Sequence, residues 1–143
     1  MRLYPPAASL TREALRADRI GKTRIAPGAR IVVSPYLVHR HRRLWTDPDL
    51  FDPSHFLPGA REKIDRFAYI PFGAGPRICI GMGFAMQEAV IILASVLRRF
   101  RLDPAPGHVV EPVQRVTLRP KGGMPLILRQ RRSLGRGAGA RSG

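Results

Sequence analysis

The ten residues from Phe72 to Gly81, FGAGPRICIG, hold the side chains of this sequence that could do chemistry. Cys79 is the only cysteine, and it stands just before a stretch with a helical pattern. The free N–H groups and the dipole at a helix N-terminus favour a thiolate, which is a strong ligand for a soft metal. Arg77, two residues earlier, can reach an anionic group beside that metal. Glycines let a backbone approach a flat ligand closely, and the segment has three, Gly73, Gly75 and Gly81.

A single cysteine restricts the kinds of site that this segment could form. Zinc and iron–sulfur sites need several ligands, whereas one thiolate can be the axial ligand of a haem iron. The segment does not match a P-loop, because no Gly-Lys-Ser/Thr follows the glycines. It does not match the dinucleotide-binding fingerprint either, because Gly73 and Gly75 lack its third glycine and no βαβ unit surrounds them. From the residues alone, a thiolate ligand and a buried structural cysteine both remain open.

Composition places the chain among globular proteins and gives it an unusual charge. It has 143 residues, of which 44% are hydrophobic and 24% charged, enough to bury a core. With 25 Lys and Arg against 10 Asp and Glu, the net charge is +15. Such a charge favours binding to nucleic acid, to an anionic membrane surface or to an acidic protein. The longest apolar run, Ala89 to Leu97, is about half of a membrane span, and no secretory signal is evident, so we expect a cytoplasmic protein.

The elements on the N-terminal side of the cysteine segment are predicted to be short. Arg30 to Ser34 is typical of a strand, preceded by a turn at Ile25 to Gly28. His39 to Trp45 is polar and basic, a helix or turn that we expect to form a basic surface. Thr46 to Arg61 contains three prolines and is predicted to be an ordered, meandering loop. Apolar side chains would attach this loop to a core, with the anchors Trp45, Leu50, Phe51, Phe56 and Leu57.

The elements after the cysteine segment are predicted to be one long helix and a hairpin. Phe84 to Phe100 has few polar residues, so we expect a buried helix. Val113 to Leu118 and Pro125 to Arg129 are strand-like, and the turn residues Pro120 to Gly123 between them indicate a β-hairpin. From Arg129 onward the sequence is basic and of low complexity, and we expect it to be disordered.

The cysteine segment resembles the haem-binding signature of the cytochrome P-450 family, F-G-x-G-x-R-x-C-x-G, at all six fixed positions. The resemblance covers residues 1 to about 130 and leaves 131–143 as a basic tail. Arg2 is similar to the arginine of the family's E-x-x-R helix motif. Asp52 to Phe56 resembles the P-x-R-F meander motif, with His55 in place of arginine, and Pro120 to Leu126 resembles the family's C-terminal hairpin.

The resemblance implies a role for each matching residue around haem b. Cys79 would be the axial ligand of the haem iron, Phe72 would pack near its sulfur, and Arg77 would pair with a haem propionate. Arg12 is placed like a second propionate-binding arginine. The glycines at 73, 75 and 81 would allow close approach to the porphyrin. Ala7 to Leu10 resembles a segment that borders the substrate pocket, and Arg2 and His55 would join a network beneath the haem.

The fold that the resemblance implies is mainly α with small β-sheet regions, of which this chain would be a C-terminal portion. The parental enzyme would be a monooxygenase, which inserts one atom of O2 into a small organic substrate. Its electrons would come from an acidic ferredoxin or flavodoxin-like protein docked on basic residues around the cysteine side. Those residues would be the segment His39 to Arg43 together with Arg98, Arg99 and Arg101.

The oxygen-activating residues of the family have no match in this sequence. They are an acid–threonine pair on a distal helix, and none of the four threonines here follows an Asp or Glu. We therefore expect no catalytic residue within the chain and little activity from a fragment of this length. The alternatives are an inert truncated remnant and a basic nucleic-acid-binding module. Scattered arginines and an aromatic content of 7% argue against specific nucleic-acid binding.

Overall fold

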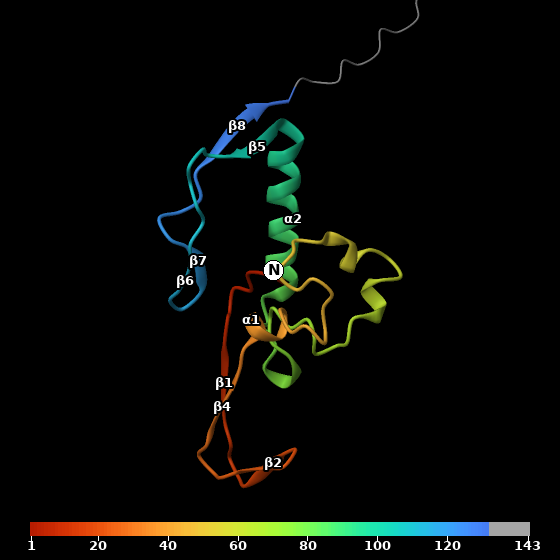
Figure 1. Ribbon diagram of the computed structural model, residues 1–143, viewed down its shortest axis with the longest axis vertical. Helices are drawn as coiled ribbons and strands as arrows, with labels where there is room; N and C mark the ends of the chain where they lie inside the picture. The colour runs from red at the N-terminus through yellow and green to blue at the C-terminus, as the bar shows by residue number, and fades with distance from the viewer. Residues whose placement is uncertain (132–143) are drawn as a thin grey trace, which may run out of the picture. The chain divides into compact units, whose positions relative to one another are not determined.

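The computed structural model describes residues 1–131, which fold as two compact units (Figure 1). Unit 1 comprises Met1–Ile80 and Glu111–Lys121, and unit 2 comprises, within the described chain, Gly81–Val110 and residues 122–131. The predicted disorder of the basic tail concerns residues that, beyond Arg131, lie outside the described part. Arg129 and Gln130, which that prediction included, instead belong to a strand.

The strands of unit 1 pair as three antiparallel ribbons. β1 (Leu10–Glu13) pairs with β4 (Arg30–Val33), so the predicted strand at Arg30 is confirmed. β2 (Asp18–Ile20) and β3 (Thr23–Ile25) form a hairpin whose turn contains Gly21 at φ +58. β6 (Pro112–Gln114) pairs with β7 (Leu118–Pro120). The Leu118 N–H donates to the Pro6 carbonyl over 2.9 Å and attaches this last ribbon to the N-terminal segment.

Short helical turns connect these ribbons to the cysteine segment. α1 (Pro35–Val38) begins directly after β4, where Ser34 caps it by accepting from the Leu37 N–H at 3.3 Å. Three 3₁₀ turns follow, at Pro53–Phe56, Arg61–Lys63 and Gly75–Arg77. Thr46 to Arg61 is thus largely an ordered loop, as its prolines predicted.

The core of unit 1 is small and is centred on Trp45, which is 4% exposed. The rings of His55, Phe56 and Tyr69 surround the indole, with centroids 5.5, 6.1 and 6.4 Å from it. Trp45 is therefore the predicted anchor, and Phe56 is half-buried beside it. The other predicted anchors are wrong: Leu50, Phe51 and Leu57 are exposed, because the meander turns their side chains away from this cluster.

Unit 2 contains one long helix followed by a two-stranded sheet. α2 (Met82–Arg99) is followed directly by β5 (Phe100–Pro104), which pairs antiparallel with β8 (Leu126–Gln130) (Figure 1). The predicted helix exists, but none of its 18 residues is buried, so the prediction of a buried helix is wrong. Among the described residues of unit 2, β5 packs on α2, and two strands cannot cover every side of an apolar helix.

Two other expectations are corrected by the strand pairing. The predicted hairpin of Val113 to Leu118 with Pro125 to Arg129 does not form, because β6 turns back at Val116 to pair with β7 while β8 pairs with β5. The description as mainly α also fails for these residues. The regular elements of the described chain are two α-helices, three short 3₁₀ turns and eight short strands. The small β-sheet regions of that prediction match, as do the meander and the helix that follows the cysteine loop.

Candidate functional site

Backbone hydrogen bonds within unit 1 shape the cysteine segment as a closed loop. The Cys79 N–H donates to the Phe72 carbonyl at 3.0 Å, which joins the two ends of the loop. The Ile78 N–H donates to the Gly75 carbonyl at 3.0 Å, and the Gly73 N–H donates to the Ile70 carbonyl at 3.0 Å. The loop thus holds Cys79 at a fixed place with few contacts to the rest of the unit.

Two of the three predicted glycines are required by backbone conformation. Gly73 lies at φ +79 and Gly75 at φ +72, in the left-handed region that side chains disfavour. A Cβ on Gly73 would lie 3.5 Å from Leu10 Cδ1, an ordinary contact, so the angle rather than space requires glycine. Gly81 is different: it precedes α2 in unit 2 with φ −84, which any residue can adopt.

The Cys79 thiol is free and exposed, which excludes the buried structural cysteine that the sequence left open. Two exposed aliphatic side chains flank it, Ile78 at 45% and Ile80 at 105% relative exposure. Phe72 is half-buried at the other end of the loop. A sulfur between exposed apolar side chains, on a loop bent by two glycines, suits contact with a flat apolar ring that carries a metal.

The two predicted propionate-binding arginines are exposed and available. Arg77 lies in the 3₁₀ turn of the loop, and no side-chain hydrogen bond or ion pair engages it within residues 1–131. Arg12 lies on β1, where its Nη1 donates to the Thr11 carbonyl at 2.9 Å. Nothing in the described chain joins Arg12 to Cys79 directly.

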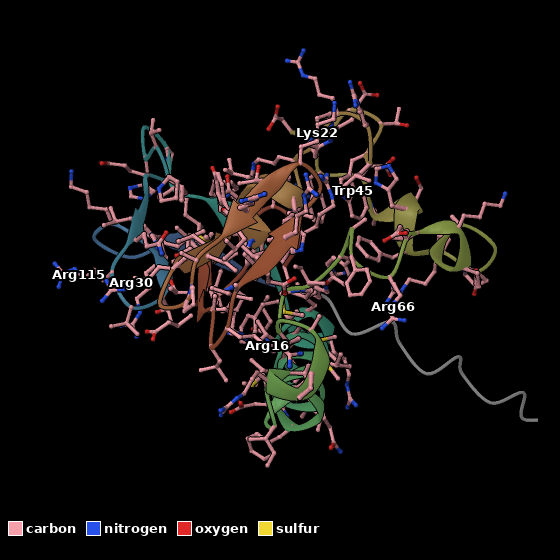
Figure 2. All side chains as sticks on the ribbon, turned by 90° about the horizontal axis from the view of Figure 1, so that it is seen from below. Arg16, Lys22, Arg30, Trp45, Arg66 and Arg115 are labelled. Carbon is pink, nitrogen blue, oxygen red and sulfur yellow. The ribbon has the colours of Figure 1, made fainter. Side chains whose placement is uncertain are left out.

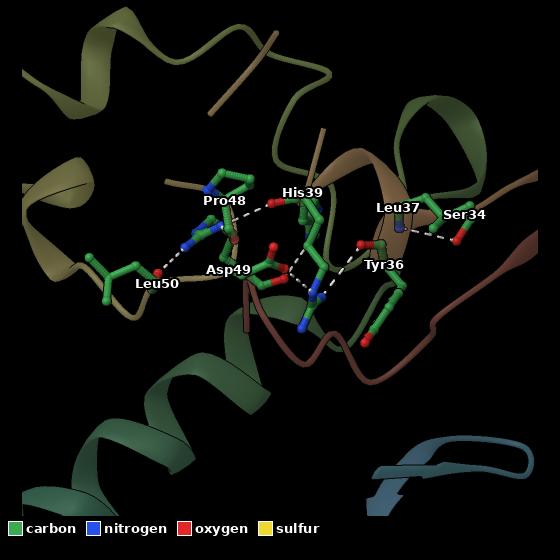
Figure 3. A network of polar contacts seen from close by, with 9 residues as sticks. Ser34, Tyr36, Leu37, His39, Pro48, Asp49 and Leu50 are labelled. Carbon is green, nitrogen blue, oxygen red and sulfur yellow. Dashed lines mark hydrogen bonds and ion pairs between the residues drawn. The ribbon is translucent and has the colours of Figure 1, made fainter. Parts of the chain in front are cut away.

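Arg2 is buried and bound to the backbone of the meander and of the segment before it, and its expected place in a network beneath the haem stays a prediction. It is 4% exposed, and its guanidinium donates to three backbone carbonyls, those of His39, Pro48 and Leu50 (Figure 3). It also lies 5.0 Å over the Trp45 ring. His55 packs on that same ring, but no hydrogen bond joins His55 to Arg2, and its Nδ1 is buried without a partner in the described chain.

His39 corrects the expected basic surface, because it is fully buried. Its Nε2 accepts from the Ile70 N–H at 2.9 Å, so the ring proton sits on Nδ1 and is donated to the Arg2 carbonyl at 3.0 Å. Burial, together with the neighbouring cations Arg2 and Arg40, lowers the pKa of His39 to about 4. The neutral ring of His39 therefore links two segments by hydrogen bonds: the N-terminal segment at Arg2 and the residues before the cysteine loop at Ile70.

No signal in the sequence identified His39 as this link, since it opens a run of basic residues. Arg40, next in that run, is also engaged: its guanidinium lies 3.8 Å over the Tyr36 ring and pairs with Asp49 at 3.5 Å (Figure 3). The exposed part of the predicted basic segment is therefore only His41, Arg42 and Arg43.

The segment expected to border a substrate pocket lines a cavity in unit 1. Ala8 and Ser9 line a space of about 320 Å³ together with Tyr36, Leu37 and Leu118. Among residues 1–131, no helix has the length and apolarity to cross a membrane. Within the same residues no cluster of three or more metal-ligating side chains occurs, so Cys79 would act as a lone protein ligand.

Comparison with known proteins identifies the family. The sequence model of cytochrome P450 matches residues 1–127, which is most of the chain. The chain belongs to the cytochrome P450 family. Members of this family carry haem iron, so the resemblance of the cysteine segment to the haem-binding signature is supported by a match that extends far beyond it.

Relatives of this cytochrome P450 chain come from distant organisms. It is 39% identical to cyclooctatin synthase of Streptomyces melanosporofaciens over 118 residues, which cover 82% of this chain and 26% of the relative. It is 38% identical to taurochenodeoxycholic 6 alpha-hydroxylase of Sus scrofa over 131 residues, covering 91% of this chain and 26% of the relative. The chain thus spans about a quarter of the length of the curated relatives it matches.

Solved cytochrome P450 structures share the fold of the described residues. The haem domain of cytochrome P450DA aligns with a TM-score of 0.85 and 32% identity, covering 92% of this chain and 29% of that structure. Several short sheets, one long helix and a loop that holds the cysteine therefore form part of a larger family fold.

Proposed function

We propose that this chain supplies the cysteine side of the haem site in a haem-thiolate monooxygenase, with the Cys79 sulfur as the axial ligand. The observation that carries the proposal is the exposed thiol of Cys79 on a loop closed by its own N–H bond to Phe72. Haem held by a thiolate supplies the chemistry by which one atom of O2 is inserted into an organic substrate.

Each side chain of the loop then has a task. Cys79 would donate electron density from sulfur to the iron, and the exposed aliphatic side chains of Ile78 and Ile80 would offer apolar contacts to the bound porphyrin. Phe72 would limit solvation of the sulfur from within the loop. Arg77, exposed and unengaged, would neutralise a propionate by a charge-assisted hydrogen bond, and Arg12 would do the same from β1.

A carbon monoxide difference spectrum tests the ligand. The chain reconstituted with haem, reduced and exposed to carbon monoxide should show the strongly red-shifted Soret band of thiolate ligation. Cys79→Ala should lose that band. Met86→Ala, which removes an exposed sulfur side chain from α2, is the matched control and should keep it.

Three results would contradict the assignment. The first is a histidine-type spectrum in the unmodified chain, and the second is an unchanged Soret band in Cys79→Ala. The third is a failure to take up haem by a protein sample in which Trp45 fluorescence shows that unit 1 is folded. Because no acid–threonine pair is present, we expect substrate turnover by the chain alone to stay well below about 1 per second.

We further propose that an acidic ferredoxin or flavodoxin-like protein delivers electrons and is steered by Arg42 and Arg43. Both are exposed, and neither is in an ion pair within the described chain. Reversing both to Glu should slow reduction of the haem-loaded chain and flatten its dependence on ionic strength. The same reversal at Arg115 and Arg119 is the control. Equal effects of the two reversals would show that Arg42 and Arg43 contribute only net charge.

A further inference from the structure

We propose that Arg19 and Arg24 form a clamp for a phosphate group on the β2–β3 hairpin. The two residues are directly opposite each other in the ladder, which pairs Arg19 with Arg24 and Ile20 with Thr23. Opposite side chains in an antiparallel pair start about 5 Å apart at Cβ. The two arginine side chains therefore leave the same face of a short ribbon, where like charges directly opposite each other repel and destabilise it.

Nothing within residues 1–131 neutralises this pair of arginines. All four ion pairs of the described chain lie elsewhere, at Arg40, Arg101, Lys121 and Arg129. The nearest carboxylate in sequence, Asp18, lines the same cavity as the two arginines. Its Oδ1 accepts from the Arg19 backbone N–H at 2.7 Å, and it forms no ion pair with either guanidinium group. Within the described chain no ion pair therefore offsets the repulsion between the two arginines.

The space beside the two arginines can hold such an anion. An open cavity of about 650 Å³ is lined by Ala17, Asp18, Arg19, Arg24, Ile25 and Ala26. Two further cations on the same segment are exposed, Arg16 and Lys22, both labelled in Figure 2. Together they raise the positive potential around the cavity, which concentrates anions there.

Charge favours phosphate over a carboxylate. A carboxylate carries one negative charge and neutralises only one of the two guanidinium groups. A phosphate group offers three or four oxygens and a charge near −2, which two forks can share. The ligand is therefore a phosphate, either free or carried on a small molecule or on a lipid headgroup.

The first experiment uses inorganic phosphate, with chloride at equal ionic strength as the reference. Backbone amides of residues 17–26 should shift saturably in the NMR spectrum of the full chain. Arg19→Gln with Arg24→Gln should weaken this binding at least about tenfold. The matched control is Arg115→Gln with Arg119→Gln on the β6–β7 ribbon, where Arg119 faces Val113 rather than another arginine. It should bind phosphate as the unmodified chain does.

A second experiment separates free phosphate from a lipid headgroup. Vesicles of phosphatidylcholine containing phosphatidic acid are compared with phosphatidylcholine alone. A chain of net charge +15 binds anionic vesicles non-specifically, so the comparison is between the two double variants, which have equal charge. The clamp is assigned to a headgroup if two results are found together. Vesicle binding is weakened at least about tenfold only in the Arg19 and Arg24 variant, and the unmodified chain does not respond to inorganic phosphate.

Removal of one of the two like charges gives a further check. In the absence of phosphate, Arg24→Thr should raise the midpoint of urea unfolding because the repulsion between the two arginines is lost. In the presence of phosphate, the same variant should lack the extra stabilisation that phosphate gives to the unmodified chain. The proposal is overturned if both double variants lose binding equally in both experiments, or if neither probe binds the unmodified chain. Trp45 fluorescence, from the core of unit 1, confirms that each variant is folded.

Discussion

His39 makes the stability of unit 1 depend on pH in a way that can be measured. Its pKa is about 4 in the folded chain against an ordinary 6.5, because the ring is buried and its Nε2 already accepts from Ile70. Above pH 6.5 the ring is neutral in both states, and the full stability is present. As the pH falls from 6.5 to 4, only the unfolded chain gains the proton, so the free energy of unfolding decreases.

The size of this effect follows from the shift in pKa. Each pKa unit corresponds to about 1.4 kcal/mol, so a shift of about 2.5 units removes about 3 kcal/mol of stability by pH 4. Carboxylates titrate in part of the same range, so the unmodified chain has to be compared with a variant. His39→Gln keeps an acceptor for the Ile70 N–H, has no titrating ring, and loses the bond to the Arg2 carbonyl. That loss costs about 1 kcal/mol at pH 7.

Urea unfolding followed by Trp45 fluorescence gives the measurement, since this single, buried tryptophan reports unit 1 alone. Between pH 7 and 4 the unmodified chain should lose about 3 kcal/mol more than His39→Gln, so the two stability curves should cross. His41→Gln, at an exposed position, should follow the unmodified chain. Parallel decreases in the unmodified chain and His39→Gln would refute the assignment of a buried, neutral His39.

Two further predictions concern the supports of the site. Arg2→Met should destabilise unit 1 by about 3 kcal/mol in urea unfolding, because three backbone carbonyls lose a charged donor, whereas Arg66→Met, at an exposed position, should change stability by less than about 0.5 kcal/mol. Gly73→Ala should destabilise unit 1 by about 1–2 kcal/mol because of its φ of +79. Gly83→Ala, inside α2 with nothing within 4 Å of an added Cβ, should stabilise its helix by about 1 kcal/mol. Both changes can be measured in thermal unfolding followed by circular dichroism. A loss of stability in Gly83→Ala, or none in Gly73→Ala, would contradict the reasoning from backbone angles.

The cysteine loop could be predicted from sequence because its requirements are local. The positive φ angles of Gly73 and Gly75 and the position of Cys79 before a helix depend on residues close to them in the chain. The strand at Arg30 and the proline-rich meander follow from local preferences in the same way.

The errors concern features that depend on distant partners. A run such as Phe84 to Phe100 predicts a helix but not what covers it, since burial depends on residues elsewhere. The partner of β8 is β5, more than twenty residues earlier, and local turn residues pointed to a nearer strand. His39 was assigned to the surface because its neighbours are basic, while its burial depends on Arg2 and Ile70, each more than thirty residues away.

The path of the chain between the two units sets an order for folding during synthesis. Along the chain, residues 1–80 belong to unit 1, the next thirty residues belong to unit 2, and Glu111–Lys121 complete unit 1. The bond from the Leu118 N–H to the Pro6 carbonyl joins residues 112 positions apart, so it cannot form until nearly the whole described chain has left the ribosome. Such long-range closure slows folding, and the part of the cavity lining that Leu118 supplies is among the last to assemble. A ribosome stalled before residue 111 would therefore carry the cysteine loop without the wall of that cavity.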